Sequence, residues 1–223
     1  MRRFIPEYGT IMCQLSEEDN ADFFPRYQAF SAEINGFRKM QKVIVKPSQE
    51  IVQHIEVLAG AFEKKRYEIW DPLNKQYGLP WRTDVYILPN YDGILYVAKS
   101  FVPEDNEYSY YKGAEPMKNV NENKPADGTL VGTLTEEEIK ALMDIDALDA
   151  ALQNITISVS AVQEFDKFLD RFQELEKRRR SVIVPIFKRL KISMAWELTF
   201  DYSLGGIYVI NYNEPYESYE EEV

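Results

Sequence analysis

Hydrophobic residues recur at helical spacing in four segments of the chain. In the first half, apolar side chains recur every three or four residues from Phe23 to Phe37 and again from Ile51 to Tyr77. The second half shows the same spacing from Ile139 to Leu152 and from Val162 to Leu175. A period of 3.6 residues gathers such side chains on one face of an α-helix. The sequence therefore predicts four amphipathic helices, arranged as two pairs.

Short extended segments flank each predicted helix pair. Thr10–Leu15 precedes the first pair and Thr129–Leu134 precedes the second. Each pair is followed by two runs rich in β-branched and aromatic residues, separated by a glycine-containing turn, at 85–97 and at 196–210. Such runs are typical of β-hairpins. We therefore expect an α+β fold in which the order β-α-α-β-β occurs twice.

Hydroxyl side chains mark the predicted starts of the helices. Ser16 and Thr135 are each followed three residues later by an acid, which is the spacing of a capping box. Ser48 and Ser160 are the expected caps of the second helix in each pair.

Two pairs of segments are similar enough to predict an internal duplication. Gly9–Asp19 and Gly128–Glu138 share five of eleven residues at an offset of 119. Phe62–Arg66 resembles Leu175–Arg179 at an offset of 113. The change of offset means that the first copy has six extra residues, which we place within Arg38–Lys46. Missing such a repeat would misassign the whole fold.

Prolines recur at the same offset late in the second helix of each pair. Pro72 and Pro185 are expected to kink or end these helices, because proline removes a hydrogen-bond donor and clashes with the preceding turn. The domain prediction is two tandem repeats, 1–101 and 127–213, with a Pro-rich linker loop at 102–126 and an acidic tail at 214–223.

Composition and charge narrow the class of protein. The 223 residues are 45% hydrophobic and 28% charged, which excludes a wholly disordered chain. The longest uncharged apolar run, Val182–Phe187, is too short for a membrane helix, and no signal peptide is recognised. A single cysteine, Cys13, fits a reducing compartment. The formal net charge of −11 argues against binding of duplex nucleic acid. We expect a protein of the cytoplasm, or of a virion.

The residues that could carry out catalysis or bind a metal are few. No glycine-rich phosphate-binding motif is present, and His54 is the one histidine. Glu50 and His54 could share a metal but lack a third ligand nearby. Asp144, Asp146 and Asp149 do not have the spacing of a calcium loop. We therefore predict no catalytic residue, no metal and no cofactor, although a hydrolase using two carboxylates stays a third hypothesis.

The strongest charge feature is a basic stretch in the second half. Seven cations and no acid lie between Lys177 and Lys191, and tyrosines cluster in the linker and the tail. Tyrosine and arginine are common in protein interfaces. The predicted partner-binding residues are Tyr108, Tyr110, Tyr111, Arg178, Arg179, Arg180, Lys188, Arg189, Tyr216 and Tyr219.

These features favour a non-catalytic interaction or assembly protein that binds protein partners or copies of itself. In outline, duplicated helix pairs with hairpins look like the small adaptor proteins of tailed-phage necks, which stack in rings. No motif carries this likeness, so it is an analogy of architecture. The alternative hypothesis is an acidic inhibitor or regulatory binding protein.

Overall fold

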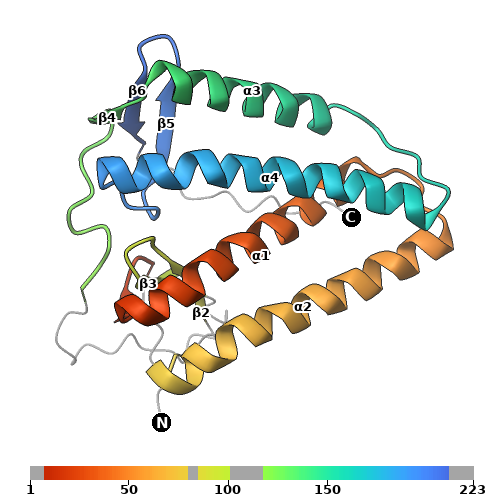
Figure 1. The fold of residues 1–223 in the computed structure, drawn as a ribbon, viewed down its shortest axis with the longest axis horizontal. Coiled ribbons are helices and arrows are strands. Elements are labelled where there is room, and N and C mark those ends of the chain that lie inside the picture. The colour runs from red at the N-terminus through yellow and green to blue at the C-terminus, as the bar shows by residue number, and fades with distance from the viewer. Residues whose placement is uncertain (1–7, 80–84, 101–117, 211–223) are drawn as a thin grey trace, which may run out of the picture.

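The computed structural model describes residues 8–79, 85–100 and 118–210, and within these ranges the fold is α+β, as predicted (Figure 1). The first half contains β1 (Ile11–Gln14), α1 (Glu17–Val43), α2 (Gln49–Tyr77), β2 (Val85–Pro89) and β3 (Ile94–Ser100). The second half contains β4 (Leu130–Thr133), α3 (Glu136–Gln153), α4 (Val162–Leu190), β5 (Leu198–Asp201) and β6 (Gly206–Val209).

Each half carries one small antiparallel sheet. The strand orders are β1-β3-β2 and β4-β6-β5, so in both sheets the last strand of the half lies between the other two. In both sheets, the pairing of the first strand with the central strand contains a register shift. Two backbone bonds join part of the predicted linker to the first strand region, from the amide of Val120 to Gly9 and from the amide of Ile11 to Lys118.

The four helices lie side by side, in the order α3, α4, α1, α2 from top to bottom in Figure 1. The sheets lie near the left end of this view, and the connections within each helix pair lie at the right end. At that right end the two connections are hydrogen-bonded, because the amide of Val45 donates to Ile157 and the amide of Ile157 donates to Val43. The central contact of the molecule is therefore between α1 and α4, one helix from each half.

Three buried clusters form the core. One lies between the first sheet and its helices, and another lies between the second sheet and its helices. The third is shared, because Met40 and Ile51 from the first half pack with Phe165 and Phe172 from the second. All four of these side chains are almost fully buried. Apolar burial is the main favourable term in folding, so this shared cluster holds the two halves together.

One glycine sets how closely the central helices approach. A Cβ atom added to Gly36 of α1 would lie 2.6 Å from the backbone nitrogen of Gln173 in α4. A real Cβ atom would not tolerate that distance. At this point the backbone of α1 at Gly36 therefore lies directly against the backbone of α4 at Gln173. The α1–α4 contact therefore depends on a residue without a Cβ.

The helix starts partly match the capping prediction. Thr135 and Glu138 form the predicted capping box. Ser16 caps α1 as predicted, but the Asp19 carboxylate accepts a hydrogen bond from the Ser16 hydroxyl, while the Ser16 amide donates to the Tyr77 hydroxyl. Ser48 caps α2 through its bond from the amide of Ile51.

One local prediction was wrong, and another is narrowed by the structure. Ser160 is not the cap of α4, because the N-cap residue of that helix is Ala161, one residue later, and α4 itself begins at Val162; the Ser160 hydroxyl donates instead to the carboxylate of Glu164. For Pro72 and Pro185, the prediction was a kink or an end; neither proline ends its helix, since α2 continues to Tyr77 and α4 to Leu190, and the kink stays a prediction. The residues directly after these prolines are buried in the core, and that burial outweighs one lost hydrogen bond.

Candidate functional site

An open groove of about 410 Å³ lies between α1 and α4. Its apolar lining consists of Phe24, Pro25, Ala29, Ala32, Val184 and Pro185. Its polar lining consists of Gln28, Lys177, Arg180, Ser181 and Lys188. Grooves of this size, mostly apolar with a few polar groups, are typical of ligand-binding sites.

Helical spacing explains why these residues line one groove. Phe24, Gln28 and Ala32 follow one another at intervals of four along α1. Lys177, Ser181 and Val184 follow at intervals of four and three along α4. Residues at these intervals share one helix face. On the α1 side, the lining includes the small side chains of Ala29 and Ala32.

Arg180 is the central charged group of the groove. Its guanidinium donates to the Gln28 side-chain oxygen at 2.7 Å and to the Ser31 hydroxyl at 2.8 Å. No carboxylate pairs with it among the described residues, and the nearby Glu176 is bound to Lys39 at 2.7 Å. Burial lowers the pKa of Arg180 from its ordinary value, yet arginine keeps its charge at neutral pH. A positive charge therefore lies beside the groove with neutral partners.

Two donors around Arg180 are unused. The Nε atom of Arg180 and the Nε2 atom of Gln28 are both buried and have no hydrogen-bond partner. A buried donor without a partner costs free energy, and most such groups are satisfied in native proteins. Arg180 and Gln28 are thus held in place with part of their hydrogen-bonding capacity unmet.

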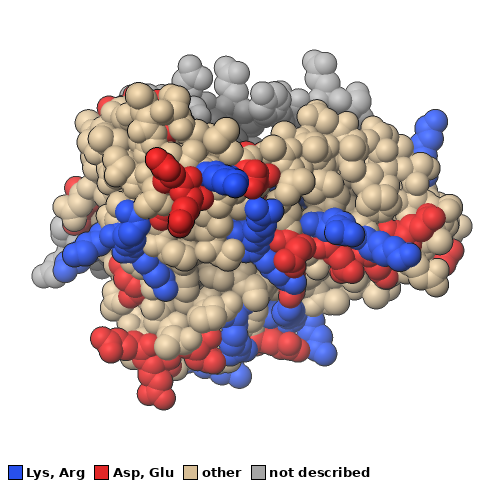
Figure 2. Space-filling model, turned by 45° about the horizontal axis from the view of Figure 1, so that its top comes forward, with Lys and Arg blue, Asp and Glu red and all other residues tan. Residues whose placement is uncertain are grey.

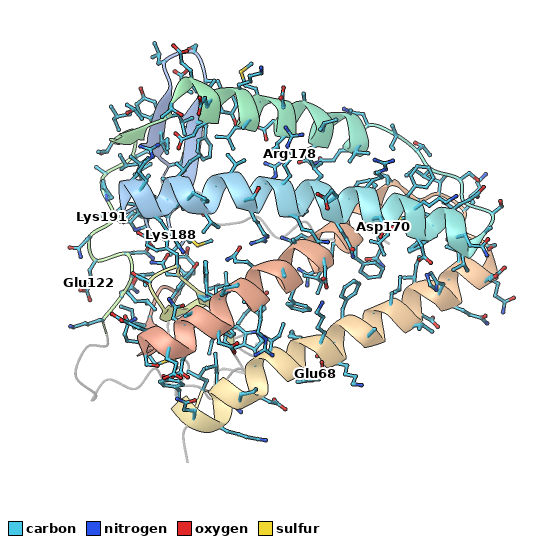
Figure 3. The ribbon with its side chains drawn as sticks, in the orientation of Figure 1. Glu68, Glu122, Asp170, Arg178, Lys188 and Lys191 are labelled. Atoms are coloured by element: carbon cyan, nitrogen blue, oxygen red, sulfur yellow. The ribbon has the colours of Figure 1, made fainter. Side chains whose placement is uncertain are left out.

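Two lysines extend this positive charge to the edge of the groove. Lys177 and Lys188 are both exposed, and the Nζ atom of Lys188 lies 5.4 Å from the centre of the Phe24 ring. Figure 3 shows Lys188 on the side of α4 that faces α1. In the part of the chain that the structure describes, neither lysine forms an ion pair with an acid. The groove thus combines an apolar floor with three cations and no acidic residue in its lining.

The other predicted basic residues are paired with α3. Arg179 binds Asp146 at 3.0 Å and Asp149 at 2.9 Å, and Arg189 binds Glu138 at 2.6 Å. Arg178 lies 3.7 Å from Asp144, so all three arginines have acidic neighbours. Figure 2 accordingly shows positive and negative side chains interleaved on this face of the molecule. The basic stretch is therefore divided: one side binds α3 and the other lines the groove.

The acids on α3 belong to a network that joins three helices. Lys39 of α1 bridges Asp149 of α3 and the buried Glu176 of α4. Burial acts to raise the pKa of Asp149, but the hydrogen bond from Lys39 and the charges of Lys39 and Arg179 outweigh it and hold that pKa below its ordinary value. These aspartates bind cationic side chains, and no group of three possible metal ligands exists among the described residues.

His54 is a contact between α2 and α4. Its Nε2 atom lies 2.7 Å from the Asp166 carboxylate, and its ring meets the Phe165 ring edge-on.

In the described part of the chain, no helix is long and apolar enough to cross a bilayer.

The structure gathers some of the predicted partner-binding residues and leaves others untested. Arg180 and Lys188 line the groove, whereas Arg178, Arg179 and Arg189 contact α3. The five predicted tyrosines, at positions 108, 110, 111, 216 and 219, lie outside the described residues. The α1 side of the groove was missed, because Phe24 and Gln28 carry no sequence signal beyond helical spacing.

Comparison with known proteins gives no relative. No protein-family model matches the chain, no curated protein matches it, and no solved structure matches it.

Proposed function

We propose that this protein is a non-catalytic interaction protein that binds an acidic segment carrying apolar side chains in the groove between α1 and α4. The observation that carries the proposal is Arg180, a partly buried guanidinium held by Gln28 and Ser31 and facing no carboxylate among the described residues. A carboxylate from outside would form the charge-assisted hydrogen bond that the chain itself does not supply there.

The groove has the chemistry for such a segment. An apolar side chain of the partner would lie on Phe24, Ala29 and Val184, and acids on either side of it would meet Lys177 and Lys188. Grooves between helices commonly bind peptides by apolar anchors, while charges at the edge set the orientation and the rate of association. Exposed ion pairs contribute only about 0–1 kcal/mol each, so the apolar anchor would supply most of the affinity.

A random peptide library displayed on phage tests this proposal. We expect the full chain to select peptides in which acids flank an aromatic residue. The variant Lys177→Glu/Lys188→Glu should lose these peptides. The control Lys140→Glu/Lys167→Glu has the same change in charge at exposed positions outside the groove lining and should keep them. Selection of peptides without acids, or equal binding by both variants, would contradict the proposal.

We also propose that the two halves arose by duplication. Equivalent glycines support this: the carbonyls of Gly93 and Gly205 accept the amides of Leu15 and Leu134, and both glycines have positive φ. Under this proposal, Gly93 corresponds to Gly205, one residue before the position that the sequence alignment predicted. The positive φ required at this turn explains why glycine occurs in both places.

Helix lengths agree with the same proposal. Both α2 and α4 have 29 residues, with a proline at corresponding places and a left-handed residue at the C-cap. The 27-residue α1 is nine residues longer than the 18-residue α3. The connection after α1, 44–48, is three residues shorter than the connection after α3, 154–161. Helix and connection together are therefore six residues longer in the first half than in the second. The change of sequence offset from 119 to 113 predicts the same six residues.

A role in a larger assembly is a further part of this proposal. An acidic segment in the groove could come from another protein or from a second copy, and repeated contacts of the second kind build rings or chains. Sedimentation of the purified chain tests this part. A mass that is a multiple of that of one chain would support it, and a monomer at all concentrations would contradict self-assembly.

A further inference from the structure

We propose that the groove is occupied by residues 211–223 of the same chain, and that a partner segment binds by displacing them. This inference rests on the proposed function of the groove, and it names the first ligand of that site. Its consequence is that the chain regulates its own binding surface.

The composition of this segment matches the groove. Residues 211–223 contain five glutamates, three tyrosines and no lysine or arginine. The groove lining contains three cations and no acid, around an apolar floor. Tyrosine provides a large apolar surface with a polar tip, so Tyr216 or Tyr219 is a suitable anchor between flanking glutamates. Residues 104–111 also combine three acids with three tyrosines, but Lys112 follows them, whereas 211–223 contains no cation over thirteen residues.

The position of the segment allows it to reach the groove. The last described residue, Ile210, follows β6, and Ile207 of β6 packs in one buried cluster with Ile186 and Phe187 near the C-terminal end of α4. The chain therefore leaves the second sheet at the same end of α4 as Lys188. Thirteen extended residues span up to about 43 Å, at about 3.3 Å each. Lys177 and Lys188, eleven residues apart, are separated by about 17 Å along the helix.

The covalent connection favours the chain's own segment over a second copy. A tethered ligand within reach of its site has an effective concentration in the millimolar range for a short flexible linker. A segment of another copy would have to reach that concentration in solution to compete. Occupation within one chain is therefore the expected state of the free protein.

Photo-crosslinking in the full chain tests the inference. We would replace Tyr216 with p-benzoylphenylalanine, mix equal amounts of ¹⁴N- and ¹⁵N-labelled protein, irradiate the mixture and identify the linked peptides by mass spectrometry. We expect links from position 216 to residues 24–32 or 177–188, with both linked peptides carrying the same isotope. The variant Lys177→Glu/Lys188→Glu should reduce the yield at least about tenfold, whereas Lys140→Glu/Lys167→Glu should not.

Three results would overturn the inference. Links outside the groove would place the segment elsewhere, links between ¹⁴N and ¹⁵N peptides would show exchange between copies, and the absence of links would show an unoccupied groove. Circular dichroism of each variant checks that it is folded. Failure here leaves the proposed function standing if the peptide library still selects groove-dependent acidic peptides, so the two failures are distinguishable.

Discussion

Neighbouring arginines on α4 have different surroundings, and the difference decides which of them can bind a partner. Arg179 is held between two aspartates of α3, so its charge is already neutralised. Arg180, the next residue, points to the other side of α4 and binds neutral oxygens of α1. Successive helical positions are rotated by about 100°, which places them in different environments. Adjacent residues of the basic stretch therefore belong to two different surroundings: Arg179 contacts α3, and Arg180 lies at the groove beside α1.

Replacing Gly36 with alanine should destabilise the fold. The added Cβ would meet the backbone of Gln173, so α1 and α4 would have to separate. We expect a loss of about 1–3 kcal/mol in the free energy of unfolding, the usual cost of overpacking. Urea denaturation measures it. Gly60→Ala is the control, because a Cβ at Gly60 contacts nothing within 4 Å, and it should stabilise α2 by about 0.5–1 kcal/mol.

Acid should weaken the network around Asp149. Its pKa is lowered in the folded protein from an ordinary value of 3.8, so the carboxylate stabilises the fold above that pH, and this contribution is lost as the pH falls further. Asp149→Asn should therefore be less stable than the native chain at neutral pH, and the gap should shrink as the pH falls below about 4. Thermal unfolding across this pH range measures the gap.

The comparison variant for this test is Asp170→Asn, which makes the same change of charge at an exposed position on α4. A gap for Asp149→Asn that stays constant from neutral to acid pH would show that the Asp149 charge does not stabilise the fold.

At the scale of the elements, the sequence predicted helices and hairpins well because local signals specify them. The amphipathic stripes, the caps at Ser16 and Thr135, and the turn glycines all act within a few residues. The sequence did not show that the helices continue past Pro72 and Pro185, because the burial that carries each helix past its proline comes from tertiary packing. The groove could not be predicted for the same reason, since Gln28 and Arg180 are 152 residues apart in sequence.

The C-caps of α2 and α4 predict opposite effects of glycine and alanine. Gly78 and Lys191 both have left-handed backbone, with φ of 65° and 55°. A residue with a Cβ pays about 1 kcal/mol there. Lys191→Gly should therefore stabilise the protein, and Gly78→Ala should destabilise it, each by about 1 kcal/mol in denaturant unfolding. Effects of the same sign would contradict a left-handed backbone at both positions.

At the scale of the whole molecule, the two halves should not fold separately. The shared cluster around Met40 and Phe165 takes its residues from both halves, so either half alone would expose that apolar surface to water. We expect residues 1–126 and residues 127–223, expressed singly, to lack a cooperative thermal transition. Mixing them should restore it, as calorimetry would show. A cooperative transition in either half alone would show that the shared cluster is dispensable.

The most direct test of the groove as a binding site is a methyl NMR titration. The full chain, labelled with ¹³C at alanine and valine methyls and with its five glutamates at 214–222 changed to glutamine, would be titrated with a peptide of native sequence 211–223. We predict that the methyl signals of Ala29, Ala32 and Val184 shift, while those of Val57 and Ala61 on the exposed side of α2 stay in place. Unchanged groove signals at saturating peptide, or equal shifts on α2, would contradict the account.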